Sequence, residues 1–143
     1  TTGKDFYLLD TFEGLSGQLL TKEEKAAGKK EHFEKEYTSC YEEVVETFAG
    51  FPFVKIIKGT VPGTLAKVPS TRIAFLSIDM NSIVPEIAAL NYFWDKLSAG
   101  GMIVLDDYAY VTCDLQYEAH NNWAKEREVK ILTLPTGQGL IVK

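Results

Sequence analysis

Three aspartates that follow two short apolar runs are the residues best suited to chemistry. Asp79 follows residues 73–78, and the pair Asp106-Asp107 follows residues 102–105. Three carboxylates gathered at one place repel one another unless a cation or protons offset their charge. Oxygen ligands of this kind suit Mg²⁺ or Ca²⁺, and such an ion can fix a substrate hydroxyl and lower its pKa. We weigh metal or polar-ligand binding here evenly against the alternative that each aspartate only caps a helix or turn.

Asp10 is a second candidate, because it ends the apolar run at residues 5–9. In nucleotide-binding α/β folds, an acidic residue at a strand end accepts hydrogen bonds from ribose hydroxyls. The sequence from Asp10 to Gly14 also suits an Asx turn, which needs no ligand. From the pattern alone we favour the turn.

The remaining reactive side chains carry weaker signals. His120 stands beside two asparagines and away from the predicted apolar face of its helix, so we interpret it as solvated rather than as a general base. His32 lies in a charged segment and could act only if that segment folded over the site. Cys113 has no recognisable histidine partner, so the pattern does not support nucleophilic catalysis. Neither a G-x-G-x-x-G motif nor a P-loop is present.

The segment between the two apolar runs has helical spacing, with apolar residues at Ile83, Ile87, Leu90, Trp94 and Leu97. An apolar run, an amphipathic helix and a second apolar run predict a βαβ unit with parallel strands. The carboxyl ends of parallel strands meet at one edge of a sheet, where ligands bind in open α/β folds. We therefore expect the three aspartates to converge on that edge.

Flanking segments extend this alternation. We predict strands over residues 5–9, 53–57, 129–134 and 140–142, and helices over residues 64–67 and 114–126. Another helix, capped by Thr38 or Ser39, is predicted to bury Tyr41, Val44, Val45 and Phe48. Gly100-Gly101 is predicted to end the central helix and begin the next strand. The turn at residues 135–139 predicts an antiparallel hairpin at the sheet edge.

Residues 21–35 are rich in charge and contain Gly28, which weakens a continuous helix. We expect this segment to be a solvated helix or loop. The alternative is a lid that covers a substrate, since such insertions often lie over active sites.

Composition limits the class of protein. The 143 residues, 45% of them hydrophobic, predict a single domain over residues 1–143. A net charge of -5 argues against nucleic-acid or anionic-membrane partners, and no apolar run is long enough to cross a bilayer. The two cysteines, Cys40 and Cys113, lack metal-ligand spacing, so a cytoplasmic location is the default expectation.

Three motifs together resemble the macrocin O-methyltransferase (TylF-type) family. They are L-D-T-F-E-G-L at residues 9–15, S-I-D-M-N at residues 77–81 and G-G-M-I-V-L-D-D-Y at residues 100–108. The ending L-P-T-G-Q-G-L-I at residues 134–141 is also similar to that of relatives. The resemblance covers essentially the whole chain. It implies a Rossmann-like, class I methyltransferase fold that uses S-adenosyl-L-methionine and a divalent metal such as Mg²⁺ to methylate sugar hydroxyls.

The resemblance also implies roles for individual residues. Asp79, Asp106 and Asp107 match the metal ligands, and Asp10 matches the acidic residue that holds the cofactor ribose. Gly59 and Thr60 fall near the place of the adenine.

The chain departs from the family at two places that bear on catalysis. The family often has an acidic general base where this chain has Asn81, and an amide cannot take up the proton. Catalysis would then rest on Asp79, Asn81 and Asp106, with a metal-bound hydroxide or another group as the base. The chain also begins at the family's second strand, without the first strand and its glycine-rich turn, so we expect an N-terminally truncated sheet.

The missing strand would leave the strands at residues 5–9 and 73–78 with unpaired edges, which are costly when buried. We expect these strands to pair directly with each other or with another copy in a homo-oligomer. The leading hypothesis is an O-methyltransferase acting on a sugar or other small polar molecule. The alternatives are a non-catalytic binding or assembly domain, an inactive fragment, and a metal-dependent hydrolase.

Overall fold

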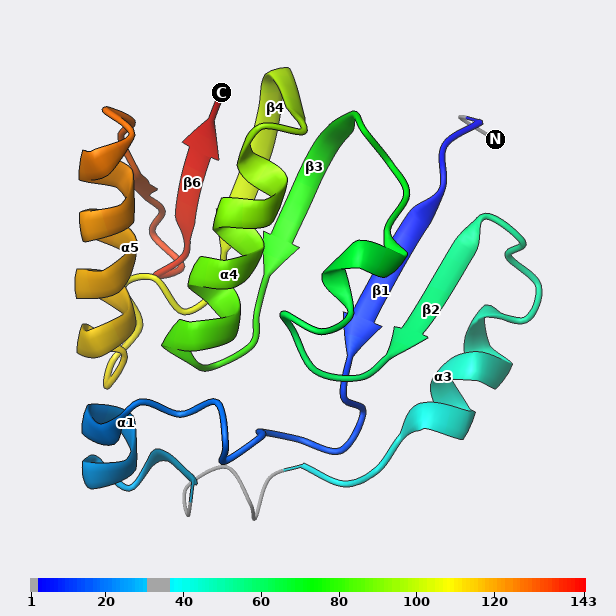
Figure 1. The fold of residues 1–143 in the computed structure, drawn as a ribbon, viewed down its shortest axis with the longest axis horizontal. Helices are drawn as coiled ribbons and strands as arrows, with labels where there is room; N and C mark the ends of the chain where they lie inside the picture. Colours follow the sequence, from blue (N-terminus) through cyan, green and yellow to red (C-terminus); the bar gives the residue numbers. More distant parts are fainter. Residues whose placement is uncertain (1–2, 31–36) are drawn as a thin grey trace.

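The computed structural model describes residues 3–30 and 37–143, and strands and helices alternate along it (Figure 1). The strands are β1 (Phe6–Asp10), β2 (Val54–Lys58), β3 (Ile73–Ile78), β4 (Leu97–Leu105), β5 (Leu132–Thr133) and β6 (Gly139–Val142). The helices are α1 (Lys22–Ala26), α3 (Tyr41–Phe48), α4 (Ile83–Trp94) and α5 (Asp114–Glu126), with a 3₁₀ turn at Leu65–Lys67. The predicted α/β fold is confirmed.

The predicted βαβ unit consists of β3, α4 and β4. The two strands are parallel neighbours, and β6 and β5 continue the sheet as an antiparallel hairpin in the order β3-β4-β6-β5. The prediction for Gly100-Gly101 is wrong: α4 ends at Trp94, and both glycines lie inside β4. The register between β3 and β4 shifts in this region, and Gly100 takes a φ of 74° within it. Glycine tolerates that backbone without a steric cost.

The strands form two sheets rather than one. Among the described strands, β1 pairs in parallel with β2 alone, and β3 pairs with β4, so the expected direct pairing of β1 with β3 is wrong. Side chains from the segment after β2, including Val61 and Leu65, line a groove of about 780 Å³ between the two strands. β1 and β3 run toward the same edge of the molecule (Figure 1), and residues of both strands line the groove.

The core lies between the four-stranded sheet and the two long helices. Helices α4 and α5 lie side by side over the same face of the sheet (Figure 1). Fully buried apolar side chains come from the helix and the strands: Leu90, Ile103, Leu105 and Ile141. Burying each such side chain contributes roughly 1.5–3 kcal/mol. The rigid central unit therefore fixes the ends of β3 and β4, which carry the predicted aspartates.

Helix α3 differs from its prediction. Its N-cap is Cys40 rather than Thr38 or Ser39, and among its described residues none is buried. Val45 remains 41% exposed. The reason is its position, because α3 lies at the edge of the molecule against the two-stranded sheet alone (Figure 1).

Helix α1 is short and is fixed by a capping box between Thr21 and Glu24. The helix ends before Gly28, which adopts a left-handed φ of 72°. This agrees with the prediction that Gly28 weakens a continuous helix. Glu24 is completely buried, however, so the interpretation of this segment as solvated is wrong at that residue. His32 lies outside the described residues. No helix in the described part of the chain is long and apolar enough to cross a membrane.

Candidate functional site

The carboxyl ends of the parallel strands meet at one edge of the molecule, with α1 opposite them (Figure 1). Asp10 is the last residue of β1, and Asp79 follows β3 directly. Ile78 pairs with Leu105, so Asp79 and Asp106 each follow a paired residue on neighbouring strands. This alignment is the one that the βαβ pattern predicts.

Five of the predicted site residues line one cavity of about 340 Å³: Asp10, Gly59, Thr60, Asp79 and Asn81. They come from three separate strand ends, after β1, β2 and β3. The volume is in the range of small-molecule pockets, roughly 300–1,000 Å³. Asp106 and Asp107 are not among the residues that line it.

Asp10 makes the predicted Asx turn. Its Oδ1 accepts a hydrogen bond from Phe12 N at 2.6 Å and another from Thr11 Oγ1 at 3.4 Å. Phe12 takes a left-handed φ of 57° within this turn and is buried. The turn fixes the Asp10 side chain at the cavity wall, so the local and the ligand-binding interpretations are compatible.

Gly59 holds the neighbouring wall of the cavity in a conformation that few other residues can take. Its φ is 139°, and a Cβ added there would lie 2.8 Å from Thr64 Cγ2. Its N–H donates to Asp10 O at 2.9 Å, which ties the ends of β2 and β1 together. A side chain at position 59 would therefore clash with Thr64.

Asn81 lies in the turn between β3 and α4 with a left-handed φ of 53°. Its Nδ2 donates to Asp79 Oδ1 at 3.3 Å and to the Tyr37 hydroxyl at 3.2 Å. Partial burial, together with the nearby carboxylates of Asp106 and Asp107, raises the pKa of Asp79 to about 6. Asp79 therefore holds its negative charge weakly in this conformation.

Asp106 and Asp107 differ in their surroundings. Asp106 Oδ1 accepts a hydrogen bond from Gln138 Nε2 at 2.6 Å. Asp107 Oδ2 is buried, and no hydrogen-bond partner for it exists among the described residues. Burial raises the pKa of Asp107, as do the carboxylates of Glu86 and Asp106, whereas the Lys29 ammonium opposes this effect.

The three predicted metal ligands thus share one electrostatic environment. Within residues 3–30 and 37–143, however, no three or more His, Cys, Asp or Glu side chains are arranged to hold a metal ion. The chemistry of the donor set and the unpaired Asp107 oxygen fit a hard cation such as Mg²⁺. Gln138 Nε2 already donates to Asp106 Oδ1, one of the oxygens that such a cation would use.

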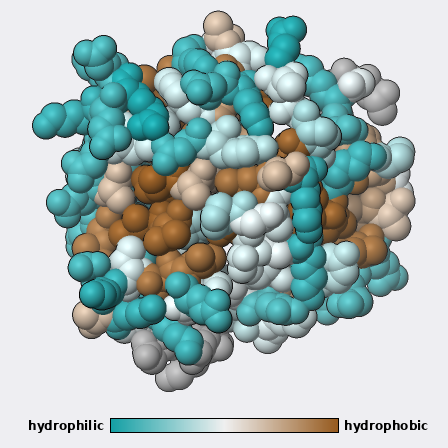
Figure 2. Space-filling model, in the orientation of Figure 1, coloured by the Kyte–Doolittle hydropathy of each residue, from teal (hydrophilic) through white to brown (hydrophobic). Residues whose placement is uncertain are grey.

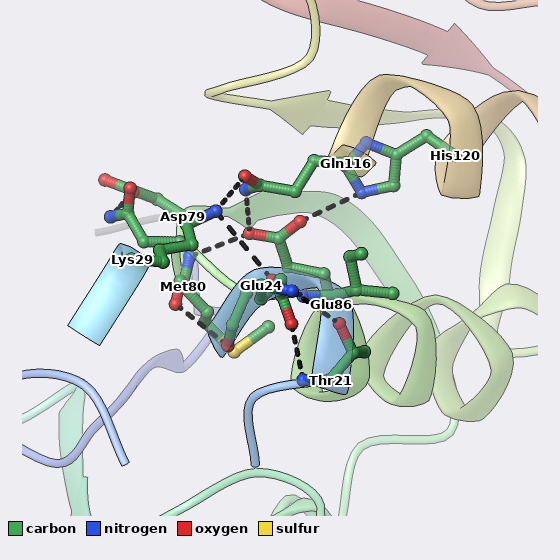
Figure 3. A network of polar contacts seen from close by, with 11 residues as sticks. Thr21, Glu24, Lys29, Asp79, Met80, Glu86, Gln116 and His120 are labelled. Atoms are coloured by element: carbon green, nitrogen blue, oxygen red, sulfur yellow. Dashed lines mark hydrogen bonds and ion pairs between the residues drawn. The ribbon is translucent and has the colours of Figure 1, made fainter. Parts of the chain in front are cut away.

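A buried polar network that the sequence patterns did not reveal lies near Asp79 (Figure 3). Glu86 Oε2 lies 3.1 Å from His120 Nε2, and Glu86 Oε1 accepts a hydrogen bond from Gln116 Nε2 at 3.1 Å. The Lys29 ammonium donates to Gln116 Oε1 and lies 3.8 Å from Glu24 Oε1. Both glutamates, Gln116 and His120 are at most 2% exposed.

The interpretation of His120 as solvated is therefore wrong. Gln116 and His120 are four residues apart and share the buried face of α5 with Trp123 and Ala124. That spacing was a usable signal, because residues four apart lie on one side of a helix. The T-x-x-E pattern at Thr21 was another, since it marks a capping box.

Cys113 is a poor nucleophile in this fold. The thiol is buried, and burial raises its pKa to about 11, with the Asp107 carboxylate adding to the effect. A thiol must lose its proton to attack. The environment agrees with the sequence argument against nucleophilic catalysis.

Comparisons with known proteins point to one family. A family model described as Macrocin-O-methyltransferase (TylF) matches residues 1–132. A comparison with curated protein sequences finds no match.

Solved structures of several O-methyltransferases have a similar fold. The O-methyltransferase NovP is 18% identical over 99% of this chain, with a TM-score of 0.81. The calicheamicin methyltransferase CalS11 is 18% identical over 96% of the chain, with a TM-score of 0.68; its apo form is described as a TDP-rhamnose 3'-O-methyltransferase. At these identities the similarity establishes the fold alone. The chain spans about 60% of the length of both proteins.

Proposed function

The chain belongs to the macrocin O-methyltransferase (TylF) family, and from this premise we propose that it binds S-adenosyl-L-methionine and takes part in methyl transfer to a hydroxyl group. One observation carries the proposal. One cavity is lined by residues to which the family resemblance gives different roles: Asp10, Gly59 and Thr60 for the cofactor, Asp79 for the metal, and Asn81 at the place of the general base.

We assign Asp10, Gly59 and Thr60 to the cofactor. The Asp10 carboxylate at the end of β1 suits the ribose hydroxyls. Gly59 provides a wall without a side chain, where the flat adenine can approach the backbone closely. The cofactor, when bound, supplies an electrophilic methyl group.

We assign Asp79, Asp106 and Asp107 to a divalent cation such as Mg²⁺. Burial is the first cause of the raised pKa values of Asp79 and Asp107, and neighbouring carboxylates add to it; a cation would offset that negative charge. A cation held there would orient an acceptor hydroxyl and favour loss of its proton. Catalysis then depends on Asp79, Asp106 and the Asn81 amide holding the acceptor oxygen in line with the methyl group.

The acceptor that we propose is a sugar or another small polar molecule. Carboxylates and an amide offer hydrogen-bond partners to several hydroxyl groups at once. CalS11, a protein of similar fold, is described as acting on TDP-rhamnose, which makes a nucleotide-linked sugar a reasonable first probe.

Isothermal titration calorimetry tests the cofactor proposal directly. We expect 1:1 binding of S-adenosyl-L-methionine and much weaker binding by Asp10→Asn. A chain that shows no heat of binding would instead support the second candidate, a non-catalytic domain or an inactive fragment. The groove between β1 and β3 favours that candidate, because it adjoins the cavity and leaves the cavity open on that side. Four residues line both the groove and the cavity: Leu9, Val61, Asp79 and Met80.

Activity is tested with TDP-rhamnose and S-adenosyl-L-methionine in the presence of Mg²⁺ or of a chelator. We expect methyl transfer only with the metal, and none by Asp106→Ala. Full activity in chelator would overturn the metal role while leaving the cofactor site standing. A metal-dependent hydrolase is disfavoured by family membership.

We also propose that a second copy of the chain covers the open strand edges along the groove. Unpaired backbone groups on β1 and β3 are a template for another strand, and a homo-oligomer would satisfy them. The free thiols Cys40 and Cys113 suit a reducing compartment such as the cytoplasm.

A further inference from the structure

The turn that presents Asp79 and Asn81 is held by two carboxylates that lie outside it (Figure 3). This turn, residues 79–82, joins β3 to α4. Met80 N donates to Glu86 Oε1 at 3.4 Å. Ile83 N donates to Glu24 Oε1 at 2.9 Å. Backbone donors on both sides of Asn81 therefore depend on buried acidic side chains.

Glu24 replaces a missing cap on α4. Ser82 has the extended backbone of an N-cap residue, but its side chain makes no capping hydrogen bond within the described chain. The first N–H groups of a helix lack intrahelical partners and carry partial positive charge, so a carboxylate is favourable there. Glu24 supplies that carboxylate from α1, 59 residues earlier in the chain.

Glu24 is held in place by contacts with Thr21 on one side and Lys29 on the other. At one end, Thr21 N donates to Glu24 Oε2 at 2.8 Å, and Glu24 N donates to Thr21 Oγ1 at 3.1 Å. At the other end, Lys29 binds Gln116 of α5 and lies 3.8 Å from Glu24. A five-residue helix is not stable by itself in water, so α1 depends on these contacts.

We propose that Glu24 is a positioning residue for the site: through Ile83 it sets the 79–82 turn, and Lys29 keeps Glu24 oriented. Asn81 holds a left-handed backbone in this turn, which asparagine adopts more readily than other non-glycine residues, and the hydrogen bonds of Met80 N and Ile83 N flank it. Segment 21–30 is then a structural part of the site rather than solvated surface. The inference uses the proposed function only for the chemistry of Asp79 and Asn81.

The test compares Glu24→Gln with the matched control Glu23→Gln. The glutamine keeps the size of the side chain, but its NH₂ group cannot accept from Ile83 N or Thr21 N, so one of the two bonds is lost. Glu23 is the exposed neighbour in the same helical turn, and its substitution makes the same change of charge.

Amide hydrogen exchange and side-chain NH₂ resonances, both followed by NMR, give readouts that do not need activity. In Glu24→Gln we expect amide exchange to rise about tenfold at Ile83 or at Thr21, whichever N–H loses its acceptor. We also expect the Asn81 NH₂ resonances to shift. Both signals should match the wild type in Glu23→Gln.

Calorimetric titration with Mg²⁺ on the same proteins separates positioning from simple capping. We expect several-fold weaker Mg²⁺ binding in Glu24→Gln and unchanged binding in the control. Faster exchange at Ile83 or Thr21 with unchanged Asn81 resonances and Mg²⁺ binding would make Glu24 a structural cap only and overturn the proposal, as would unchanged exchange at both.

Two further outcomes are distinguishable. If the wild type itself does not bind Mg²⁺, the metal part of the proposed function fails, and the Asn81 resonances alone decide the role of Glu24. If Glu24→Gln does not fold, Lys29→Met replaces it: loss of the ammonium should shift the same Asn81 resonances, and an unchanged spectrum overturns the proposal.

Discussion

At the scale of single residues, Asp79 links the electrostatics of the site to the stability of the fold. Its pKa is about 6 in the folded chain against an ordinary value of 3.8, so the folded state binds the proton more tightly than the unfolded state. Stability from this group is therefore greatest below pH 3.8 and falls as the pH rises toward and through 6. Ionised Asp79 destabilises the fold at neutral pH.

We predict that Asp79→Asn is more stable than the wild type at pH 7.5 and loses this part of the pH dependence. The gain should be about 1 kcal/mol, because the side chain is exposed and solvent screens its charge. Urea unfolding from pH 4.5 to 7.5 measures it. The control Asp95→Asn removes a carboxylate at the far end of α4. Equal pH slopes in wild type and Asp79→Asn would contradict the prediction.

Gly59 tests the cavity wall. Gly59→Ala should destabilise the fold by about 1–3 kcal/mol, because its φ of 139° and the 2.8 Å approach to Thr64 Cγ2 leave no room for a Cβ. Binding of S-adenosyl-L-methionine should weaken as well. Gly63→Ala is the matched control, since its added Cβ would come no closer than 3.4 Å to Thr60 O. Thermal unfolding measures stability and calorimetry measures binding. Similar results for both variants would contradict a steric restriction specific to Gly59.

Gln138 holds one carboxylate oxygen of Asp106, and this contact predicts a role in metal affinity. Groups that orient a metal ligand typically change affinity about 10–100-fold when removed. We expect Gln138→Leu to weaken Mg²⁺ binding within that range. Thr136→Val, which removes only the donor to Gln138 Oε1, should have a smaller effect. Calorimetry with Mg²⁺ decides, and tighter binding by Gln138→Leu would show that the bond instead withholds Asp106 from the ion.

At the scale of elements, α4 and α5 are joined by a polar contact inside the core. Glu86 of α4 meets Gln116 and His120 of α5, all buried. Removing His120 leaves the buried Glu86 Oε2 without its neighbouring imidazole, and a buried polar atom without a partner costs about 1–3 kcal/mol. We therefore predict that His120→Ala lowers the free energy of unfolding by about that amount, whereas Asn122→Ala, exposed on the same helix, changes it little. Urea unfolding measures both, and equal stabilities would contradict a structural role for the pair.

The sequence predicted some elements better than others for physical reasons. The β3-α4-β4 unit was recognisable because continuous apolar runs and helical spacing reflect burial on all sides. The burial of α3 was overestimated, because an apolar stripe shows what a helix can bury and not how much sheet lies against it. Glu24 and His120 were missed for the converse reason, since charged residues are buried only where distant partners satisfy them.

At the scale of the whole molecule, the candidate site and the groove between β1 and β3 adjoin each other and share lining residues. The aspartates at the strand ends followed from the βαβ pattern, and the unpaired edges of β1 and β3 followed from the family's strand order. The groove itself could not be predicted, because it depends on side chains such as Val61 and Leu65 that come from a third segment. Figure 2 shows apolar surface in the middle of the visible face, between hydrophilic margins, so burial by a partner would be favourable.

The strand edge of β1 offers a test of whether a second copy fills the groove. Phe6 N donates to Phe53 O, and Asp10 O accepts from Gly59 N, so these even-numbered residues direct their backbone groups toward β2. Backbone groups alternate in direction along a strand, and those of Tyr7 therefore face the groove. Tyr7→Pro removes a groove-facing donor without touching the β1–β2 ladder. Tyr7→Ala removes the same side chain and keeps the donor.

We predict that wild type and Tyr7→Ala form dimers or larger assemblies in size-exclusion chromatography with light scattering, and that Tyr7→Pro shifts to the monomer. Leu8→Pro should instead destabilise the chain by about 1–3 kcal/mol, because its N–H belongs to the ladder with β2 and proline leaves the acceptor unpaired. Equal masses for the alanine and proline variants would show that side chains rather than strand pairing make the interface. A monomeric wild type would exclude a second copy as the partner, and the groove-facing backbone of Tyr7 would then remain solvated in the isolated chain.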